Sequence, residues 1–318
     1  MNHYLNKCIE KVIIRNKLSS ILIAISGGQD SLCLIQLIDN FMQNYNVLQS
    51  IEYIYIDHQW KKDSEKQIEH LINYISNTGK NLCIYQLNSI LLSEGKAREH
   101  RYHIIINHAV KYKYQAIITA HTKTDRIETF FQNLIKGTSI DGATSLTISR
   151  KLSNKLYLMR PLIDIDRVDI SWFCRKYCLP IWSDLTNYYL YIKRNRIRYE
   201  LIPYLNNYFN NKVNDNLTHF LDRSNQENEY LKQNTLKLYI SSRHSKYIAL
   251  NYTVVITQHY ALQSRILQLF FYHNFNLLIT NTMIIQLIKA FCKKNTNIKI
   301  LQWRNLKIYL NNLWIYIR

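Results

Sequence analysis

Four short apolar runs, each followed by an amphipathic segment, give the first 135 residues a regular alternation. Continuous apolar runs are typical of strands buried on both faces, and parallel strands need a crossover of about a dozen residues between them. The sequence therefore predicts an α/β fold with a doubly wound parallel sheet. The predicted strands are residues 20–25, 51–56, 82–87 and 115–120, and the predicted helices between and after them are residues 30–42, 64–75, 97–112 and 125–135.

In such a fold ligands bind beyond the carboxyl ends of the strands, so the segment after the first run is a candidate site. It reads SGGQDS, residues 26–31. Two glycines let the backbone turn tightly and approach a ligand, while Ser26, Ser31 and the N–H groups of the next helix can donate to an anion. A phosphate is the natural ligand. An ordinary turn with Asp30 or Ser31 capping the helix is the alternative, and the Walker and dinucleotide patterns are absent.

Three further polar segments lie near predicted strand ends: DHQWKKDS, EGKAREHRY and AHTKTDRIET. Asp125 and Glu128 in the last segment share a helix face and can bind a cation or accept a proton, although acidic residues are also common in a first helical turn. Arg98 and Arg101 in the second segment are likewise three residues apart, which suits a grip on phosphate or a solvated helix face. His58 and His121, each just after a strand, are candidates for nucleotide contact.

Positive charge is concentrated in the second part of the chain. The formal net charge is +19, of which residues 1–185 carry +6 and residues 186–318 carry +13. This asymmetry favours a polyanion-binding surface, although an AT-rich genome that supplies many lysines would also produce it. The segment KRNRIRYELIP contains four candidate phosphate contacts. They are Lys193, Arg194, Arg196 and Arg198.

The rest of the chain reads as mainly helical. A long helix is predicted over residues 214–243, with further helices over 262–274 and 282–291 and short strands near the end. No apolar run reaches the roughly 18 residues of a membrane span. The six cysteines are scattered without a C-x-x-C pair, which predicts reduced thiols rather than disulfides or a zinc site.

Together these motifs resemble those of a known protein family. SGGQDS resembles the pyrophosphate loop of the N-type ATP pyrophosphatases, or PP-loop family. The segments DHQWKKDS, AREHRY, AHTKTDRIETFFQNLIKGTSIDGATSL, RPLIDIDRVDI and SDLTNYYLYIKRNRIRYELIPYL follow in order, and with the loop they resemble the tRNA(Ile)-lysidine synthase family. The resemblance implies an adenine nucleotide alpha hydrolase-like catalytic domain at 1–185, a basic linker with the RN-x-x-R motif at 186–212 and a helical tRNA-binding domain at 213–318.

The activity that this resemblance implies is ligation of L-lysine to the 2-oxo position of the wobble cytidine in a CAU-anticodon tRNA(Ile), through an adenylated intermediate. Decoding then changes from AUG to AUA. The implied cofactors are ATP and Mg²⁺, the implied partners are that tRNA and free lysine, and no membrane is involved. The family also suggests a homodimer. The AT-rich composition favours a plastid stroma and an organelle-encoded protein over a bacterial cytoplasm.

The resemblance also assigns roles to residues. The implied catalytic residues are Asp30, Asp125, Glu128, Arg98 and Arg194, with Asp30 also positioning Mg²⁺. The implied ATP-binding residues are Ser26, Gly27, Gly28, Gln29, Asp30, Ser31, His58 and His121. The implied tRNA-binding residues are Arg101, Lys193, Arg196 and Arg198.

The sequence also departs from the family. Gln59 and Trp60 replace a glycine and leucine of many relatives, TKTD is less acidic than the usual stretch before Asp125, and the longest relatives carry an additional C-terminal module. Three alternatives remain at this point: a tRNA thiolase, an NAD-synthetase-like amidating enzyme and a non-catalytic RNA-binding protein. The thiolase would need reactive cysteines, whereas Cys174 and Cys178 read as packing residues.

Overall fold

The computed structural model describes residues 2–57, 59, 64–87, 94–182, 188–292, 299–311 and 313–317. The chain divides into two compact units, Met1–Asp222 and Arg223–Arg318. The division falls inside the long helix α10 (Val213–Ser242), whereas the sequence suggested a boundary just before this helix. No helix within the described ranges is long and apolar enough to cross a membrane.

The first unit is built on a six-stranded sheet with the order β3-β2-β1-β4-β6-β5. Strands β1, β2, β3, β4 and β6 run parallel, and β5 pairs antiparallel with β6. The predicted parallel sheet is thus confirmed, with an edge hairpin that the sequence analysis did not anticipate. The strands are β1 (Ser20–Ile25), β2 (Ser50–Asp57), β3 (Asn81–Gln86), β4 (Ala116–Thr119), β5 (Ser149–Lys151) and β6 (Tyr157–Met159).

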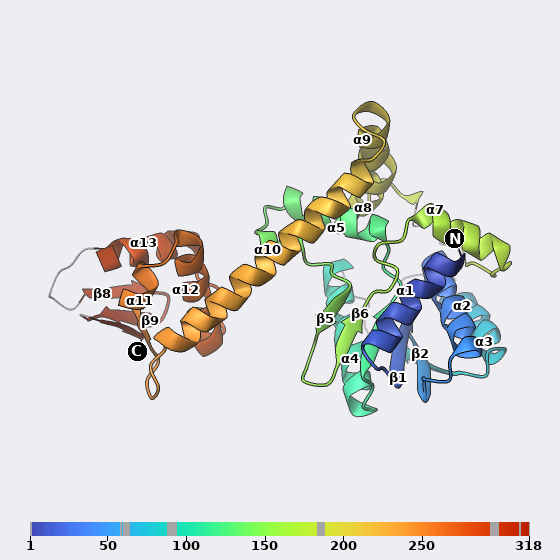
Figure 1. Ribbon diagram of the computed structural model, residues 1–318, viewed down its shortest axis with the longest axis horizontal. Helices are drawn as coiled ribbons and strands as arrows, with labels where there is room; N and C mark the ends of the chain where they lie inside the picture. The colour runs from blue at the N-terminus through green and yellow to red at the C-terminus, as the bar shows by residue number, and fades with distance from the viewer. Residues whose placement is uncertain are drawn as a thin grey trace. The chain divides into compact units, whose positions relative to one another are not determined.

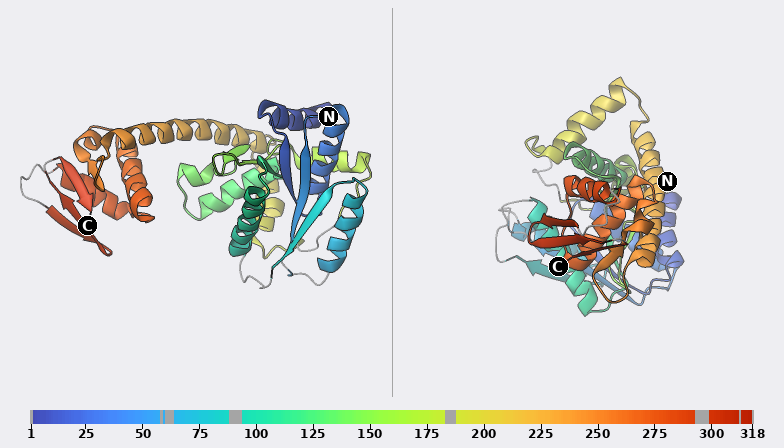
Figure 2. Two further views of the ribbon diagram at one scale, coloured as in Figure 1. Left: turned by 90° about the horizontal axis from the view of Figure 1, so that it is seen from below. Right: turned by 90° about the vertical axis from the view of Figure 1, so that its left-hand side faces the viewer.

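Helices cover both faces of this sheet, as the continuous apolar strands require (Figures 1 and 2). Ile21 and Ile23 of β1 pack into a core with four helices, whereas Leu22 between them packs on the opposite face with α4. All three side chains are fully buried. The four helices of the first face are α1 (Asn2–Arg15), α2 (Gln29–Asn44), α3 (Ser64–Ser76) and α7 (Arg167–Lys176), and α4 spans Glu94–Lys111.

The chain order of the strands creates a switch point between β1 and β4. From β1 the chain moves outward to β2 and β3, and then returns to place β4 on the other side of β1. Right-handed crossovers in opposite directions place their helices on opposite faces, which is why α4 lies across the sheet from α2 and α3. The loops after β1 and β4 therefore diverge at one point, and in open α/β sheets such a point is where ligands bind.

A second group of helices follows the sheet in the first unit. These are α5 (Lys123–Ile135), α6 (Ile140–Ala143), α8 (Lys193–Arg196), the π-helical turn η2 (Ile197–Leu201) and α9 (Ile202–Tyr208). The last three form one uninterrupted helical stretch, residues 193–208. Ile197 and Ile202 pack with Ile127 of α5 and fix the stretch against that helix. A π-turn inside an α-helix is often found at functional sites.

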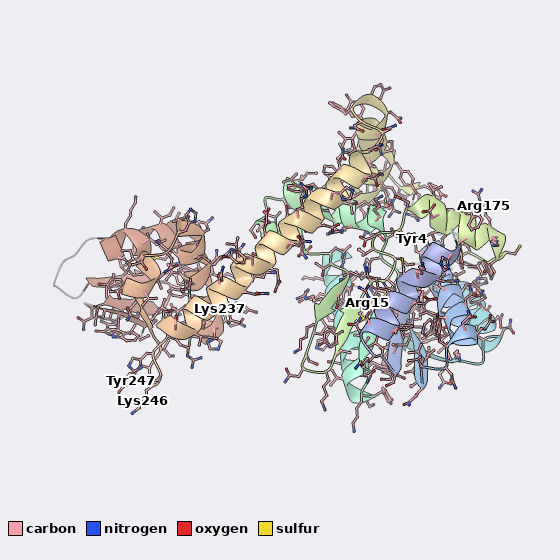
Figure 3. The ribbon with its side chains drawn as sticks, viewed as in Figure 1. Tyr4, Arg15, Arg175, Lys237, Lys246 and Tyr247 are labelled. Atoms are coloured by element: carbon pink, nitrogen blue, oxygen red, sulfur yellow. The ribbon has the colours of Figure 1, made fainter. Side chains whose placement is uncertain are left out.

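The second unit has its own core between helices and an antiparallel sheet of order β7-β10-β9-β8. Phe270, Phe271 and Ile308 are buried in it. Lys237, Lys246 and Tyr247 carry exposed side chains on this unit (Figure 3). The predicted helices and late strands are present. Beyond α10 the elements are β7 (Ala249–Asn251), α11 (Tyr252–Ile256), α12 (Tyr260–Phe275), α13 (Asn281–Cys292), β8 (Lys299–Trp303), β9 (Leu306–Leu310) and β10 (Trp314–Ile317).

Candidate active site

The loop after β1 has the backbone that its glycines suggested. Gly27 has a φ of +73°, a left-handed conformation that other residues adopt only under strain. A Cβ at this position would also lie 3.2 Å from Nε2 of Gln67, and that amide donates a 2.7 Å hydrogen bond to the carbonyl of Ser26. Helix α3 thus holds the loop through Gln67, and Gly27 leaves room for this contact.

The hydroxyl groups of the loop lie together at the start of α2. Ser31 donates to the carbonyl of Gly28 at 2.9 Å, and its Oγ lies 3.4 Å from that of the exposed Ser26. Gly28 precedes the helix, whose N-terminus favours negative charge. Gln29 behaves differently, because its side chain donates to Ser171 of α7 at 2.7 Å. The loop therefore offers serines and backbone to an anion, and the Gln29 amide is engaged elsewhere.

Asp30, in the first turn of α2, has a carboxylate oxygen that receives no hydrogen bond from the described residues. This oxygen, Oδ1, is buried. Burial raises the pKa of Asp30 to about 6, Arg167 opposes this rise, and Asp125 of α5 adds to it. A carboxylate oxygen that lacks a donor and lies beside a phosphate-binding loop is chemically suited to Mg²⁺, which prefers oxygen ligands and often bridges carboxylates and phosphates.

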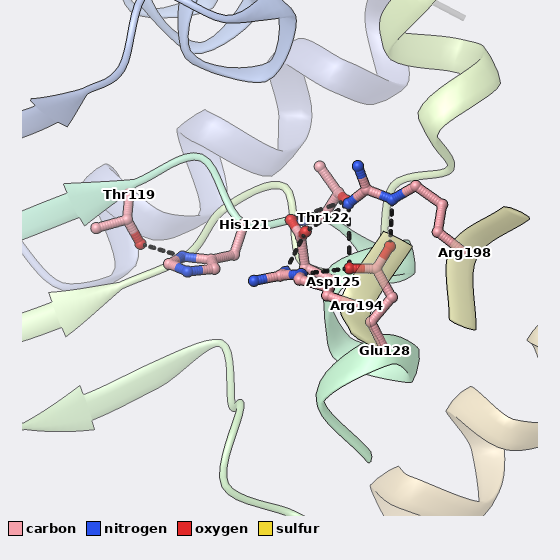
Figure 4. A network of polar contacts seen from close by, with 7 residues as sticks. All are labelled: Thr119, His121, Thr122, Asp125, Glu128, Arg194 and Arg198. Atoms are coloured by element: carbon pink, nitrogen blue, oxygen red, sulfur yellow. Dashed lines mark hydrogen bonds and ion pairs between the residues drawn. The ribbon is translucent and has the colours of Figure 1, made fainter. Parts of the chain in front are cut away.

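The two predicted carboxylates of α5 are both paired with arginines from residues 193–208 (Figure 4). Arg194 donates through Nη2 to Asp125 at 2.7 Å and through Nε to Glu128 at 2.6 Å. Arg198 donates through Nε and Nη2 to Glu128, the latter at 3.1 Å, and Nη2 also lies 3.4 Å from Asp125. Glu128 is 0% exposed. These four side chains form a largely buried charge cluster, called the carboxylate–arginine cluster below.

Asp125 is fixed further by its own helix. The carboxylate accepts a 2.9 Å hydrogen bond from the backbone N–H of Thr122 and lies 3.1 Å from the Thr122 hydroxyl. These contacts cap the N-terminus of α5. Burial opposes its ionisation, but Arg194, His121, the Thr122 N–H and Arg198 outweigh that effect and hold the pKa of Asp125 below its usual value. The side chain is therefore a carboxylate at neutral pH.

The four basic residues predicted as phosphate contacts lie in the helical stretch 193–208 and form two pairs with different surroundings. Arg194 and Arg198 face Asp125 and Glu128, whereas Lys193 and Arg196 are exposed. Arg196 forms an ion pair of 2.8 Å with Glu200 on its own helix. Spacing alone grouped all four as phosphate contacts, and only the fold shows which pair lies at the carboxylates.

The guanidinium groups of Arg98 and Arg160 act on His121 at the end of β4, and these two arginines are called the cationic flank below. His121 shares a hydrogen bond of 2.9 Å with Thr119 through Nδ1. Burial lowers the pKa of His121, and Arg160, Arg98 and Arg194 lower it further against the opposing effect of Asp125. His121 is thus neutral near pH 7 and lies among guanidinium groups that suit a phosphate or a nucleotide.

The remaining predicted residues are placed as follows. Arg98 and Arg101 are half-buried on α4, and the Arg98 guanidinium lies 5.8 Å from the ring centre of Tyr102. His58 lies outside the described residues. Its neighbour Asp57, at the end of β2, is buried and accepts hydrogen bonds from the Ser64 hydroxyl and the Gln59 N–H.

Two residues with evident parts in the site were missed in the sequence. Gln67 positions the loop from α3, and a glutamine in an amphipathic helix gives no signal of such a role. Arg160 is buried beside β6, where it donates to the carbonyl of Thr147 at 2.8 Å. Burial lowers the pKa of Arg160. Its position at the start of RPLIDIDRVDI was the available signal.

Comparisons with known proteins identify the family to which the chain is similar. Residues 1–205 match the model of the PP-loop domain family. The chain is 50% identical to a chloroplastic tRNA(Ile)-lysidine synthase of Gracilaria tenuistipitata var. liui, with 94% of this chain and 92% of the relative covered. It is 36% identical to the chloroplastic enzyme of Pyropia yezoensis over 99% and 96% of the two chains. A tRNA(Ile)-lysidine synthase of the cyanobacterium Nostoc is 38% identical over 69% of this chain and 63% of its own.

A solved structure resembles the fold alone. The U34-tRNA thiolase from Methanococcus maripaludis has a TM-score of 0.56 and 15% sequence identity, covering 70% of this chain and 77% of its own. That thiolase carries a [4Fe-4S] cluster. Here Cys174 is buried and donates to the carbonyl of Gln29 at 3.5 Å, whereas Cys178 is exposed.

Proposed function

Because the chain belongs to the tRNA(Ile)-lysidine synthase family, we propose that it joins the side-chain amine of free L-lysine to the 2-oxo position of a wobble cytidine. The chain is a ligase with an ATP-binding PP-loop domain. The proposed substrate is a tRNA(Ile) with a CAU anticodon. ATP transfers AMP to the cytidine oxygen and releases pyrophosphate, the lysine amine then displaces AMP, and the product decodes AUA instead of AUG.

The observation that best supports this proposal is the convergence of three carboxylates with the phosphate-binding loop at one sheet edge. Asp30 follows β1, and Asp125 and Glu128 follow β4. Both Asp125 and Glu128 are close enough to affect the pKa of Asp30. One anion-binding loop beside carboxylates at a switch point suits a reaction that cleaves ATP and admits a cationic co-substrate.

The proposed roles begin with the loop. Ser26, Gly27, Gly28 and Ser31 hold the pyrophosphate, and Asp30 holds Mg²⁺, which would neutralise the charge that builds up on the leaving group. The cationic flank of Arg98 and Arg160, next to the neutral His121, binds the nucleotide. Gln29, whose amide is bonded to Ser171, contributes through its backbone only.

Asp125 and Glu128 are the proposed site for the lysine ammonium. Asp125 remains ionised because its pKa is low. It therefore attracts the lysine ammonium but is a poor acceptor for the proton that the ammonium must lose. The amine must lose a proton before it attacks, and a base with a pKa near the working pH does this best. A lowered pKa makes Asp125 a weak base, so its proposed part is to hold the ammonium group in place.

The tRNA-binding roles rest on charge. We propose that Lys193 and Arg196, both exposed, contact tRNA phosphates together with Arg101, while Arg198 acts beside Arg194 in the carboxylate–arginine cluster. The unit 223–318 contains no acidic residue after Glu229 and is proposed to bind the tRNA body. A homodimer and a plastid location complete the proposal, the latter in keeping with its chloroplastic relatives.

Incorporation of radiolabelled lysine into a CAU-anticodon tRNA(Ile) transcript, with ATP and Mg²⁺, tests the function. Wild-type protein should label the tRNA only when ATP is present, and Asp30→Ala should not. Asp39→Ala is the matched control, because Asp39 lies on the same helix with a pKa also raised by burial to about 6 but follows the loop by more than two turns. No label with folded wild-type protein and competent tRNA would exclude the lysidine activity.

A further inference from the structure

A group of exposed tyrosines surrounds the helical stretch 193–208. Monomeric proteins seldom expose large contiguous aromatic surfaces, and those that do use them for binding. Each of these rings is at least 42% exposed, and several are already ordered in pairs. The tyrosine platform consists of Tyr188, Tyr189, Tyr191, Tyr199, Tyr204 and Tyr208.

Two pairs of platform rings are stacked, whereas the rings of Tyr204 and Tyr208 are 5.0 Å apart and tilted by 40°. Tyr188 and Tyr199 are 6.0 Å apart at an interplanar angle of 18°, and Tyr189 and Tyr191 are 5.5 Å apart at 25°. Parallel exposed rings can extend their stack onto another planar ring, and every nucleobase offers such a face. Because these tyrosine rings are already fixed in pairs, they lose less conformational entropy when a base binds.

An open pocket of about 450 Å³ lies within the same region. Its apolar wall includes Ile197, Leu201 and the ring of Tyr204, and the side chains of Lys193 and Arg196 are on its lining. The volume is in the range of small-molecule pockets, roughly 300–1,000 Å³. An apolar wall with cations beside it is complementary to a flat base that carries a phosphate.

The charge of the surface decides between possible occupants. Glu200 is the acidic group on the pocket lining, and Arg196 neutralises it at 2.8 Å. Lys193 thus leaves the lining with net positive charge. Tyrosine interleaved with lysine and arginine favours single-stranded nucleic acid, whereas a protein interface is usually depleted of lysine.

The pocket and the carboxylate–arginine cluster are carried by adjacent faces of one helix. Arg194 and Arg198, four residues apart, face Asp125 and Glu128, whereas Lys193, Ile197 and Tyr204 line the pocket. Tyr204 is six residues beyond Arg198, which corresponds to roughly 9 Å along a helix axis. An RNA loop that places one base at the carboxylates can therefore place a neighbouring base in the pocket.

We propose that the pocket and the tyrosine platform bind an unpaired anticodon-loop nucleotide adjacent to the wobble cytidine, by stacking on Tyr204. This inference rests on the proposed function and adds a base-stacking subsite to it. The subsite would hold the loop open while the cytidine is in the active site. Five of the six platform tyrosines lie within the segment SDLTNYYLYIKRNRIRYELIPYL, but the sequence predicted a role for none of them.

The test uses tRNA(Ile) transcripts with the fluorescent base 2-aminopurine on one or the other side of the wobble cytidine. Stacking on an aromatic ring quenches this base, so one transcript should lose fluorescence when wild-type protein binds. Tyr204→Ala should abolish the quenching and raise the KM for tRNA by about 5- to 150-fold, the range for loss of one base–aromatic stack. Tyr204→Phe should keep both, because it keeps the ring.

Tyr112→Ala is the control variant. Tyr112 is 55% exposed in the same unit but follows the end of α4 at the opposite edge of the sheet, and its removal should change neither quenching nor KM. Sedimentation velocity of each variant measures self-association at the same time.

The outcomes separate the two proposals. If wild-type protein fails to label tRNA with lysine, the proposed function fails. If wild-type protein labels tRNA while Tyr204→Ala retains quenching and KM, the stacking subsite is refuted and the function stands. If Tyr204→Ala loses a dimer and leaves quenching unchanged, the platform is a contact between two copies of the chain, and the subsite is refuted as well.

Discussion

Replacement of Glu128 by glutamine tests whether the carboxylate–arginine cluster holds the site together. Glu128 is fully buried and accepts hydrogen bonds from both Arg194 and Arg198. Removing one partner of a buried ion pair costs about 3–5 kcal/mol, because the other charge loses its compensation. Here Asp125 remains within 2.7 Å of Arg194 and 3.4 Å of Arg198, so we expect a loss below that range, about 2–3 kcal/mol.

A double-mutant cycle with Arg198→Met isolates the pair itself. Arg198→Met leaves Glu128 with Arg194 alone, so it should also destabilise the first unit. In the double variant the carboxylate and guanidinium are both gone, and the loss should be smaller than the sum of the single losses. A coupling energy above about 1 kcal/mol is expected for side chains in one buried network.

Amide hydrogen exchange in the full chain is the suitable assay, because two compact units need not unfold in one step. Peptides from α5 and α8 report on the first unit alone. The exposed pair Arg196–Glu200 is the control, since its loss through Glu200→Gln should cost under about 1 kcal/mol. If Glu128→Gln also costs under about 1 kcal/mol, or the two single losses simply add, the cluster does not stabilise the site and this reasoning is wrong.

Three further predictions concern the loop and the carboxylates. Asp30→Asn should stabilise the Mg²⁺-free protein by up to about 3 kcal/mol at pH 8 and not at pH 4, because a folded pKa of about 6 makes stability fall as pH rises from about 4 through 6; amide hydrogen exchange of α2 peptides at both pH values measures this. Gly27→Ala should cost about 1–2 kcal/mol and weaken ATP binding in calorimetry, whereas Gly79→Ala, at a φ of +67° with no atom within 4 Å of its Cβ, should show the backbone cost alone. Asp125 has a lowered pKa, so its stabilisation is complete above its ordinary pKa of about 4 and is lost as pH falls through the folded value; Asp125→Asn should flatten the acid limb of the stability curve below pH 4.

The sheet and its loops were predictable because their signals are local. Uninterrupted apolar runs such as residues 20–25 must be buried on both faces, and the polar segments that follow them must then lie at one sheet edge. The positive φ of Gly27 follows from the same stretch. The hairpin β5–β6 was not predictable, because its strands have three residues each and β5 is exposed throughout.

The pairings within the site depend on the fold and not on spacing. Arg194 lies 66 residues beyond Glu128, and no sequence pattern connects them. The same holds for Gln29 and Ser171, which are 142 residues apart, and for Gln67, whose hydrogen bond to Ser26 spans 41 residues. Local sequence thus identifies the groups that can do chemistry, while tertiary packing decides which of them are already engaged.

The charge balance of the cluster connects the helical stretch 193–208 to the order of binding. Asp125 and Glu128 are neutralised by Arg194 and Arg198, so in the free protein they offer a lysine ammonium little net attraction. Phosphate groups of ATP or tRNA compete for the same guanidiniums, and a charge-assisted contact to phosphate is as strong as one to carboxylate. An arginine that turns toward a phosphate leaves a buried carboxylate without compensation, and that is the state in which a cationic amine binds best. Under the proposed function, the amine site would therefore attract lysine only once the anionic substrates are bound, and the nucleophile would not occupy a site that has nothing to ligate.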